Sequence, residues 1–281
     1  MQNVAEPNKT MIGGVASLML WAVPLMLLAL QNASGAEPSN AGRVATRPNP
    51  GAAAGEHPLA RAIELAKKSQ QALESVRDYE ATFYKREQVG RRLIAHTMHI
   101  KHRVKPFSVY LRFQKPHTGR EVIYVDGRND GNLLVHETGL VGFLGTFSLK
   151  PTSPDALSES LHPITNIGMP NLVGSIIAQW EAERRYGETE VKYYQNAKLG
   201  TTDCFVIQTT HPQRRKQFNF QKTMLYLDKA HNFPVRVEQW EFPHAQGAAP
   251  RLNGAYTYLN IKTNVGFNDR DFDTRNPNYG F

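Results

Sequence analysis

The feature that most constrains the fold is a run of alternating apolar and polar residues between two proline-containing turns. In the stretch 95–127, these turns contain Lys105-Pro106 and Lys115-Pro116. The large apolar residues between them are Phe107, Val109, Leu111 and Phe113. A period of two places these side chains on one face of a β-strand. A neighbouring strand over 122–125 ends at an Asp-Gly turn, so the sequence predicts a β-meander whose apolar face needs a cover.

The rest of the chain supplies that cover and further strands. Apolar residues at helical spacing predict one helix over 59–76, with Pro58 near its first turn, and a second helix over 171–185. Further strands are predicted at 79–89, 91–104, 133–137, 191–198, 203–210, 224–228, 233–242 and 254–262. Short turns between consecutive strands favour antiparallel pairing. The predicted fold is mainly β (α+β), with about nine to ten strands in a strongly curved antiparallel sheet or half-barrel.

The N-terminal 36 residues have the layout of an export signal. Lys9 precedes an uncharged, mostly apolar run over 11–30, and Ser34-Gly35-Ala36 supplies the small residues that signal peptidase requires. We expect cleavage after Ala36, or an uncleaved membrane anchor because the apolar run is long. Residues 37–56 are rich in Pro, Gly and Ala and are predicted to be a disordered linker. The expected organisation is a signal peptide over 1–36, this linker, and one domain over 57–281 in the periplasm or cell envelope.

Positive charge is concentrated in residues 85–120. This stretch contains ten Lys and Arg residues and a single acid, Glu87, which gives it a formal charge of +9 in a chain of +8. It forms either an ordinary solvated sheet face or a surface that contacts anionic lipid headgroups. The export signal argues against a nucleic-acid partner. The residues assigned to an anionic-surface contact are Lys85, Arg86, Arg91, Arg92, Lys101, Arg103, Lys105 and Arg112.

Motifs for catalysis, metal binding or cofactor binding are missing from the sequence. His96, His99 and His102 are close in sequence, but on a strand His96 and His102 lie about 20 Å apart and His99 faces the other way. No GxSxG, HExxH, CxxC or phosphate-binding glycine loop occurs. Cys204 is the only cysteine and lies in an apolar strand pattern, so it is expected to be buried. We therefore predict no catalytic residue, no metal site and no cofactor.

Several short motifs, taken in order, resemble the LolA/LolB lipoprotein carriers. The motifs are Lys105-Pro106-Phe107, Lys115-Pro116, Val125-Asp126-Gly127, Leu227-Asp228, Phe233-Pro234-Val235-Arg236-Val237, the strand over 256–262 and Asp271-Phe272-Asp273. The resemblance spans residues 58–273. More closely, the chain is identified as a member of an uncharacterised family of exported bacterial proteins, the domain-of-unknown-function family 1571. Membership in that family implies no established activity.

The resemblance implies a half-open β-barrel with two helices across its concave side and an apolar cavity that holds acyl chains. The chain has no lipobox and so is not a lipid-anchored receptor of the LolB kind. Arg112 and Arg86 are candidates for the lid-locking arginine of the carriers. The expected function is non-catalytic binding of a hydrophobic ligand, either an acyl chain, a lipid or a lipidated protein. The alternative is a non-catalytic envelope scaffold or protein-interaction module with a filled core.

Residues expected to contact such a ligand lie on the apolar sheet face, on the second helix and in a glycine-interrupted segment. That segment, 139–147, is a packed loop, a lid over the cavity or a membrane-touching loop. The predicted ligand-binding residues are Phe83, Phe107, Val109, Leu111, Phe113, Tyr124, Leu140, Phe143, Phe147, Ile176 and Trp180. The sequence defines neither the ligand nor the oligomeric state.

Overall fold

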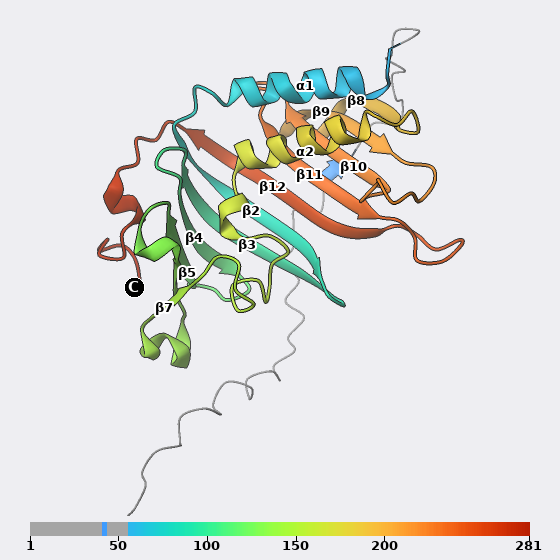
Figure 1. The fold of residues 1–281 in the computed structure, drawn as a ribbon. Coiled ribbons are helices and arrows are strands. Elements are labelled where there is room, and N and C mark those ends of the chain that lie inside the picture. The colour runs from blue at the N-terminus through green and yellow to red at the C-terminus, as the bar shows by residue number, and fades with distance from the viewer. Residues whose placement is uncertain (1–40, 44–55) are drawn as a thin grey trace, which may run out of the picture. The chain divides into compact units, whose positions relative to one another are not determined.

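The fold is seen in a computed structural model that describes residues 41–43 and 56–281. The predicted signal peptide and most of the predicted linker lie outside these residues. Within the described chain, twelve strands form one antiparallel sheet, and two α-helices pack against it (Figure 1).

The two helices are α1 (Leu59–Ala72) and α2 (Met169–Glu183). The strands are β1 (Ala41–Arg43), β2 (Asp78–Val89), β3 (Arg92–Arg103), β4 (Ser108–Lys115), β5 (Glu121–Val125), β6 (Leu133–His136), β7 (Thr146–Leu149), β8 (Glu190–Leu199), β9 (Thr202–Thr210), β10 (Lys222–Asp228), β11 (Pro234–Glu241) and β12 (Arg251–Thr263). Their order across the sheet is β1-β8-β9-β10-β11-β12-β2-β3-β4-β5-β6-β7.

The sheet consists of two sequential meanders that meet at β12. Strands β2 to β7 pair in chain order, and so do β8 to β12. The last strand, β12, then pairs with β2, which places Tyr256 opposite Lys85 and Tyr258 opposite Phe83. Residues from the two ends of the domain therefore lie side by side in the middle of the sheet.

Strand β2 shows how the sequence alternation produces an inward face of mixed character. Tyr79, Ala81 and Phe83 are buried on this face, as expected for alternating apolar residues. The same face continues with Lys85 and Glu87, which are also buried. One end of the strand thus contributes to the core, and the other brings paired charges to the interior.

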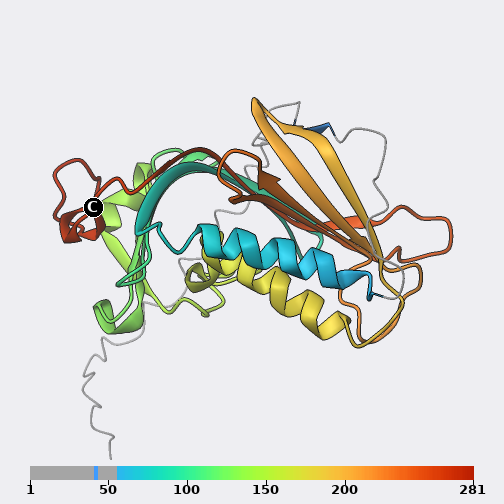
Figure 2. The same ribbon diagram turned by 90° about the horizontal axis from the view of Figure 1, so that it is seen from above.

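The two helices lie next to each other on the concave side of the curved sheet (Figure 2). Helix α1 buries Leu59, Ala62, Ile63 and Ala66, whose spacing of three or four residues defines one helical stripe. Helix α2 buries Trp180 completely. Lys67 of α1 forms an ion pair of 2.6 Å with Glu181 of α2. The predicted curved antiparallel sheet with two helices on its concave side is confirmed.

The structure differs from the sequence-based prediction at two short strands. Strand β1 lies inside the segment predicted to be a linker and pairs with the end of β8. Strand β7 follows the glycine-interrupted segment, where Gly139–Leu144 form a 3₁₀-helix, η2. Gly145 has a φ of 85°, which a residue without a Cβ adopts easily, and it connects η2 to β7. The described sheet therefore has more strands than the nine to ten expected.

A second, smaller core lies on the sheet face that points away from the helices. Residues after β12 cross this face, and Phe272 of the short 3₁₀-helix η4 (Asp269–Phe272) packs against Tyr110, Ile123 and Val125. This C-terminal segment therefore covers the outer side of β4 and β5. None of the described helices is both long enough and apolar enough to cross a membrane.

Candidate functional site

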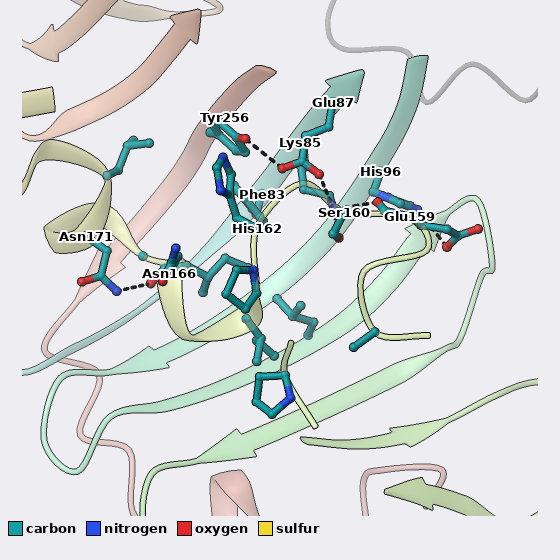
Figure 3. Close-up of a pocket in the computed structure, with 18 of the residues that line it drawn as sticks. Phe83, Lys85, Glu87, His96, Glu159, Ser160, His162, Asn166, Asn171 and Tyr256 are labelled. Atoms are coloured by element: carbon teal, nitrogen blue, oxygen red, sulfur yellow. Dashed lines mark hydrogen bonds and ion pairs between the residues drawn. The ribbon is translucent and has the colours of Figure 1, made fainter. Parts of the chain in front are cut away.

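A cavity of about 840 Å³ lies between the concave face of the sheet and its cover. The cover is α2 together with the irregular connection over 150–168 that precedes it (Figures 1 and 3). The volume is within the range typical of small-molecule binding sites. The apolar side chains of the wall include Phe83, Met98, Leu111, Phe113, Val122, Leu133, Val135, Leu149, Ile164, Ile167, Leu172, Phe220 and Val237.

The first polar cluster of the wall is centred on Glu87, which is almost fully buried. Its Oε2 lies 2.9 Å from the Lys85 ammonium nitrogen, and its Oε1 accepts a hydrogen bond of 2.8 Å from the Tyr256 hydroxyl. The backbone N–H of Leu161 donates to Oε2 at 3.1 Å. Lys85 also donates to the Ser160 hydroxyl and to the carbonyl oxygen of Glu159. These contacts, drawn in part in Figure 3, fasten the irregular connection to β2.

The second polar cluster is centred on the carboxylate of Glu159. Arg120 donates to Oε2 at 2.9 Å, and its Nε lies 2.7 Å from Oε1 of Glu137. The Nε2 atoms of His117 and His96 lie 3.1 Å and 3.5 Å from the Glu159 oxygens. The hydrogen bond with His117, the nearby imidazole of His96 and the charge of Arg120 hold the pKa of Glu159 far below its usual range.

Burial favours the uncharged form of His96. It lowers the pKa of this imidazole, and the nearby charge of Lys85 lowers it further, although Glu159 acts in the other direction. At neutral pH the cluster therefore contains an ionised Glu159 and a neutral His96.

A third polar group, Glu183, lies on the α2 side of the cavity wall. It is 2% exposed, and Gln179 donates a hydrogen bond of 2.9 Å to its Oε1. Within the described part of the chain, its Oε2 has no hydrogen-bond partner, and the nearest imidazole nitrogen, Nε2 of His211, lies 3.5 Å away. Burial raises the pKa of Glu183 to about 7. This carboxyl group therefore changes its charge near neutral pH.

The predicted ligand-binding residues divide into those that line the cavity and those that do not. Phe83, Leu111 and Phe113 line it. Val109, Tyr124, Ile176 and Trp180 belong to the filled core, and Phe107 packs against that core from a partly buried position.

The glycine-interrupted segment does not line the cavity either. Phe143 of η2 is 88% exposed, and Phe147 of β7 is partly buried. The side chain of Leu140 lies outside the described part of the chain. Neither Phe143 nor Phe147 is part of the cavity wall, so the described part of this segment gives no support to a lid.

Several of the basic residues predicted to contact an anionic surface instead face the cavity or form ion pairs within the domain. Lys85 faces the cavity because the alternation of β2 points it inward. Arg103 is buried and pairs with Asp269 at 2.8 Å, and Lys101 pairs with Asp271 at 3.3 Å. The C-terminal segment thus neutralises part of the basic stretch.

The remaining basic residues lie outside the cavity wall. Arg91, Arg92, Lys105 and Arg112 are exposed, and Arg86 is partly buried. Neither candidate for the lid-locking arginine, Arg112 or Arg86, lines the cavity. The arginine between the sheet and the cover is Arg120, which the sequence analysis did not single out.

The three histidines of β3 have separate environments. His99 lies 3.3 Å from Glu80, and the ring of His102 stacks on Tyr79 with a centroid distance of 4.9 Å. Only His96 approaches Glu159 and His117. No residue spacing in the sequence indicates that convergence, because His117 lies in a turn and Glu159 in the irregular connection.

Several solved structures are similar to this chain. The lipoprotein LppX from Mycobacterium tuberculosis is 13% identical, covers 75% of this chain and 97% of its own, and has a TM-score of 0.42. A putative outer membrane lipoprotein-sorting protein domain from Vibrio parahaemolyticus is 14% identical, with coverages of 75% and 95% and a TM-score of 0.35. A LolA superfamily protein from Nitrosomonas europaea is 10% identical, with coverages of 75% and 96% and a TM-score of 0.31.

Among curated proteins, none matches the chain. The family model described as protein of unknown function, DUF1571, matches residues 76–281. This range contains strands β2 to β12, helix α2 and all the residues that line the cavity. The predicted family membership is confirmed: the chain belongs to the DUF1571 family.

Proposed function

We propose that this protein binds the hydrocarbon part of an amphiphilic ligand in the cavity and catalyses no reaction. The ligand is an acyl chain, a lipid or a lipidated protein. The observation that carries the proposal is the apolar wall of the cavity of about 840 Å³. Each hydrocarbon group that leaves water for such a wall contributes about 0.8 kcal/mol per CH₂. A cavity of this size also argues against the alternative of a scaffold whose core is filled.

The polar clusters of the wall are compatible with an apolar ligand. Lys85 and Glu87 pair with each other, and Arg120 pairs with both Glu137 and Glu159. A hydrocarbon chain beside these pairs leaves their charges compensated, so the pairs themselves present no unpaired charge to it.

The same contacts support a role without catalysis. Ser160 is the hydroxyl closest to a basic group in the wall, but its partner is the Lys85 ammonium, which is itself paired with Glu87. An ammonium held in this way donates hydrogen bonds and cannot remove a proton from a nucleophile. Lys85 therefore does not act as a general base for Ser160.

The test compares one substitution at two matched positions on the helices. Leu172 of α2 lines the cavity and is partly buried, and Leu65 of α1 is partly buried without lining it. We expect Leu172→Glu to weaken the binding of a fluorescent fatty acyl probe by about tenfold or more, because a carboxylate resists contact with hydrocarbon. Leu65→Glu should bind the probe as the wild type does.

Thermal melts of both variants show whether each is folded, and native mass spectrometry of protein from its own membrane fraction identifies a co-purifying lipid. A wild type that binds no probe and carries no lipid would contradict the proposal. Equal losses of binding in the two variants would also contradict it, because only Leu172 lies on the wall.

We further propose that the protein is exported and acts in the cell envelope. The support is the signal-like sequence over 1–36 and the ligand-binding proposal itself. Exposed Arg91 and Arg92 and the exposed Phe143 suit contact with an anionic membrane surface. N-terminal sequencing should find a chain that begins after Ala36, or an intact chain in membranes if the segment is an anchor. An intact Met1 in a cytoplasmic fraction would refute export.

A further inference from the structure

Three potential metal ligands converge at the edge of the cavity. His96 comes from β3, His117 from the turn after β4, and Glu159 from the irregular connection. One ligand atom from each of these residues lies within 4.8 Å of the other two. The separate contacts are 3.5 Å between His96 Nε2 and Glu159 Oε2, and 3.1 Å between His117 Nε2 and Glu159 Oε1.

His96 provides an independent indication that something binds here. Its side chain is only 3% exposed, and neither of its ring nitrogens has a hydrogen-bond partner within the described part of the chain. A buried polar group without a partner is costly, and in native proteins such a group is normally satisfied by an ion, a water molecule or a ligand. The imidazole is directed at the Glu159 carboxylate, so the unsatisfied nitrogen and the acid face the same point.

We propose that His96, His117 and Glu159 bind a divalent first-row transition-metal ion, with Zn²⁺ as the representative case. Imidazole nitrogen with one carboxylate oxygen is a donor set that suits Zn²⁺ and its neighbours, whereas Mg²⁺ and Ca²⁺ prefer oxygen ligands. Ligand atoms about 2 Å from a tetrahedral ion lie about 3.3 Å from each other. The separations of 3.1 Å and 3.5 Å join the two imidazoles to different oxygens of Glu159, and one donor atom from each of the three residues lies within 4.8 Å of the other two, so small side-chain adjustments bring three donors to this spacing.

The surrounding charges are compatible with an ion at this point. Lys85 and Arg120 bring positive charge, and Glu87, Glu137 and Glu159 bring negative charge. Arg120 does not have to leave, because a carboxylate has enough lone pairs to bind an ion and to accept a hydrogen bond from Arg120 as well. Such a second partner orients the ligating carboxylate.

The site has a structural consequence for the cavity. His96 belongs to the sheet and Glu159 to the cover, and both line the cavity. A metal ion between them fastens the irregular connection to the sheet beside the Lys85–Glu87 cluster. Three protein ligands also leave one coordination position for water or a ligand. This inference goes beyond the proposed function and does not depend on it.

The experiment uses untagged mature protein stripped of metal with a chelator. Zn²⁺ is titrated in competition with a chromophoric chelator, for the wild type and three variants. His117→Asn and Glu159→Gln each remove one ligand, and asparagine tolerates the positive φ of 60° at residue 117. His99→Asn is the control, because His99 is on the same strand as His96 but pairs with Glu80.

We expect one Zn²⁺ per chain in the wild type and in His99→Asn, and an affinity at least about tenfold lower in the two ligand variants. The X-ray absorption spectrum of the zinc-loaded wild type should show two imidazole ligands. Melting curves of the metal-free variants show whether they are folded. The absence of a stoichiometric Zn²⁺ ion in the wild type would refute the site. Tight binding that survives both ligand substitutions would refute it equally.

Discussion

Replacing Glu183 by glutamine should make the stability of the protein less dependent on pH. The carboxyl group lies in the interior, with one oxygen bonded to Gln179 and the other without a partner within the described residues. Burial raises its pKa in the folded protein to about 7 from an ordinary value of 4.5. Between these two values the folded state holds the proton more tightly than the unfolded state does. The wild type therefore loses stability as the pH rises from 4.5 through 7.

The size of this loss follows from the two pKa values. One pKa unit corresponds to about 1.36 kcal/mol. Between pH 5 and pH 8 the free energy of unfolding of the wild type should fall by roughly 2–3 kcal/mol relative to Glu183→Gln. Glutamine has a similar shape and no charge to bury, so the variant should be the more stable protein at pH 8.

Urea unfolding of both proteins at pH 5, 6, 7 and 8 measures the difference. Glu181→Gln is the matched control, because Glu181 is on the same helix but is partly exposed and paired with Lys67. Lys67 lowers the pKa of Glu181. Ionisation of Glu181 therefore favours the folded state as the pH rises, whereas ionisation of Glu183 disfavours it. The reasoning fails if Glu183→Gln and the wild type show the same dependence of stability on pH.

Two further predictions concern other buried groups. Cys204 is fully buried, and burial with nearby Asp228 and Asp203 raises its pKa to about 12, so a thiol reagent at pH 8 should label it only after unfolding. Rapid labelling of the native protein would contradict that burial. Phe272→Ala should loosen the C-terminal segment, because a buried phenylalanine contributes about 3–5 kcal/mol. Proteolysis should then cleave after residue 263 faster than in the wild type, with the rest of the domain intact.

Most strands could be predicted because their residues alternate regularly. The prediction of a strand over 79–89 corresponds to β2, Asp78–Val89, because its inward and outward residues differ clearly in polarity. Strand β7 was missed because it has only four residues and follows three glycines. Strand β1 was missed because three residues between Pro-rich and Gly-rich segments carry no periodicity.

The cavity wall could be predicted only in part, since alternation defines a face of a strand but not what covers it. Val109, Leu111 and Phe113 share one face of β4, yet only Leu111 and Phe113 line the cavity. The position of the cover along the strand decides this difference. His117 and Glu159 lie 42 residues apart, in irregular segments with no sequence period, so their contact could not be inferred from the sequence.

The central position of β12 makes the completion of the sheet depend on the last described strand along the chain. This strand is the last to be synthesised, yet it fills the middle of the sheet, and its Lys262 contacts Glu80, 182 residues earlier. Until β12 is present, β2 and β11 each have an unpaired edge, which other chains can join. Contacts over such separations also slow folding. A nascent chain that ends before Arg251 therefore has two separate meanders and no continuous sheet.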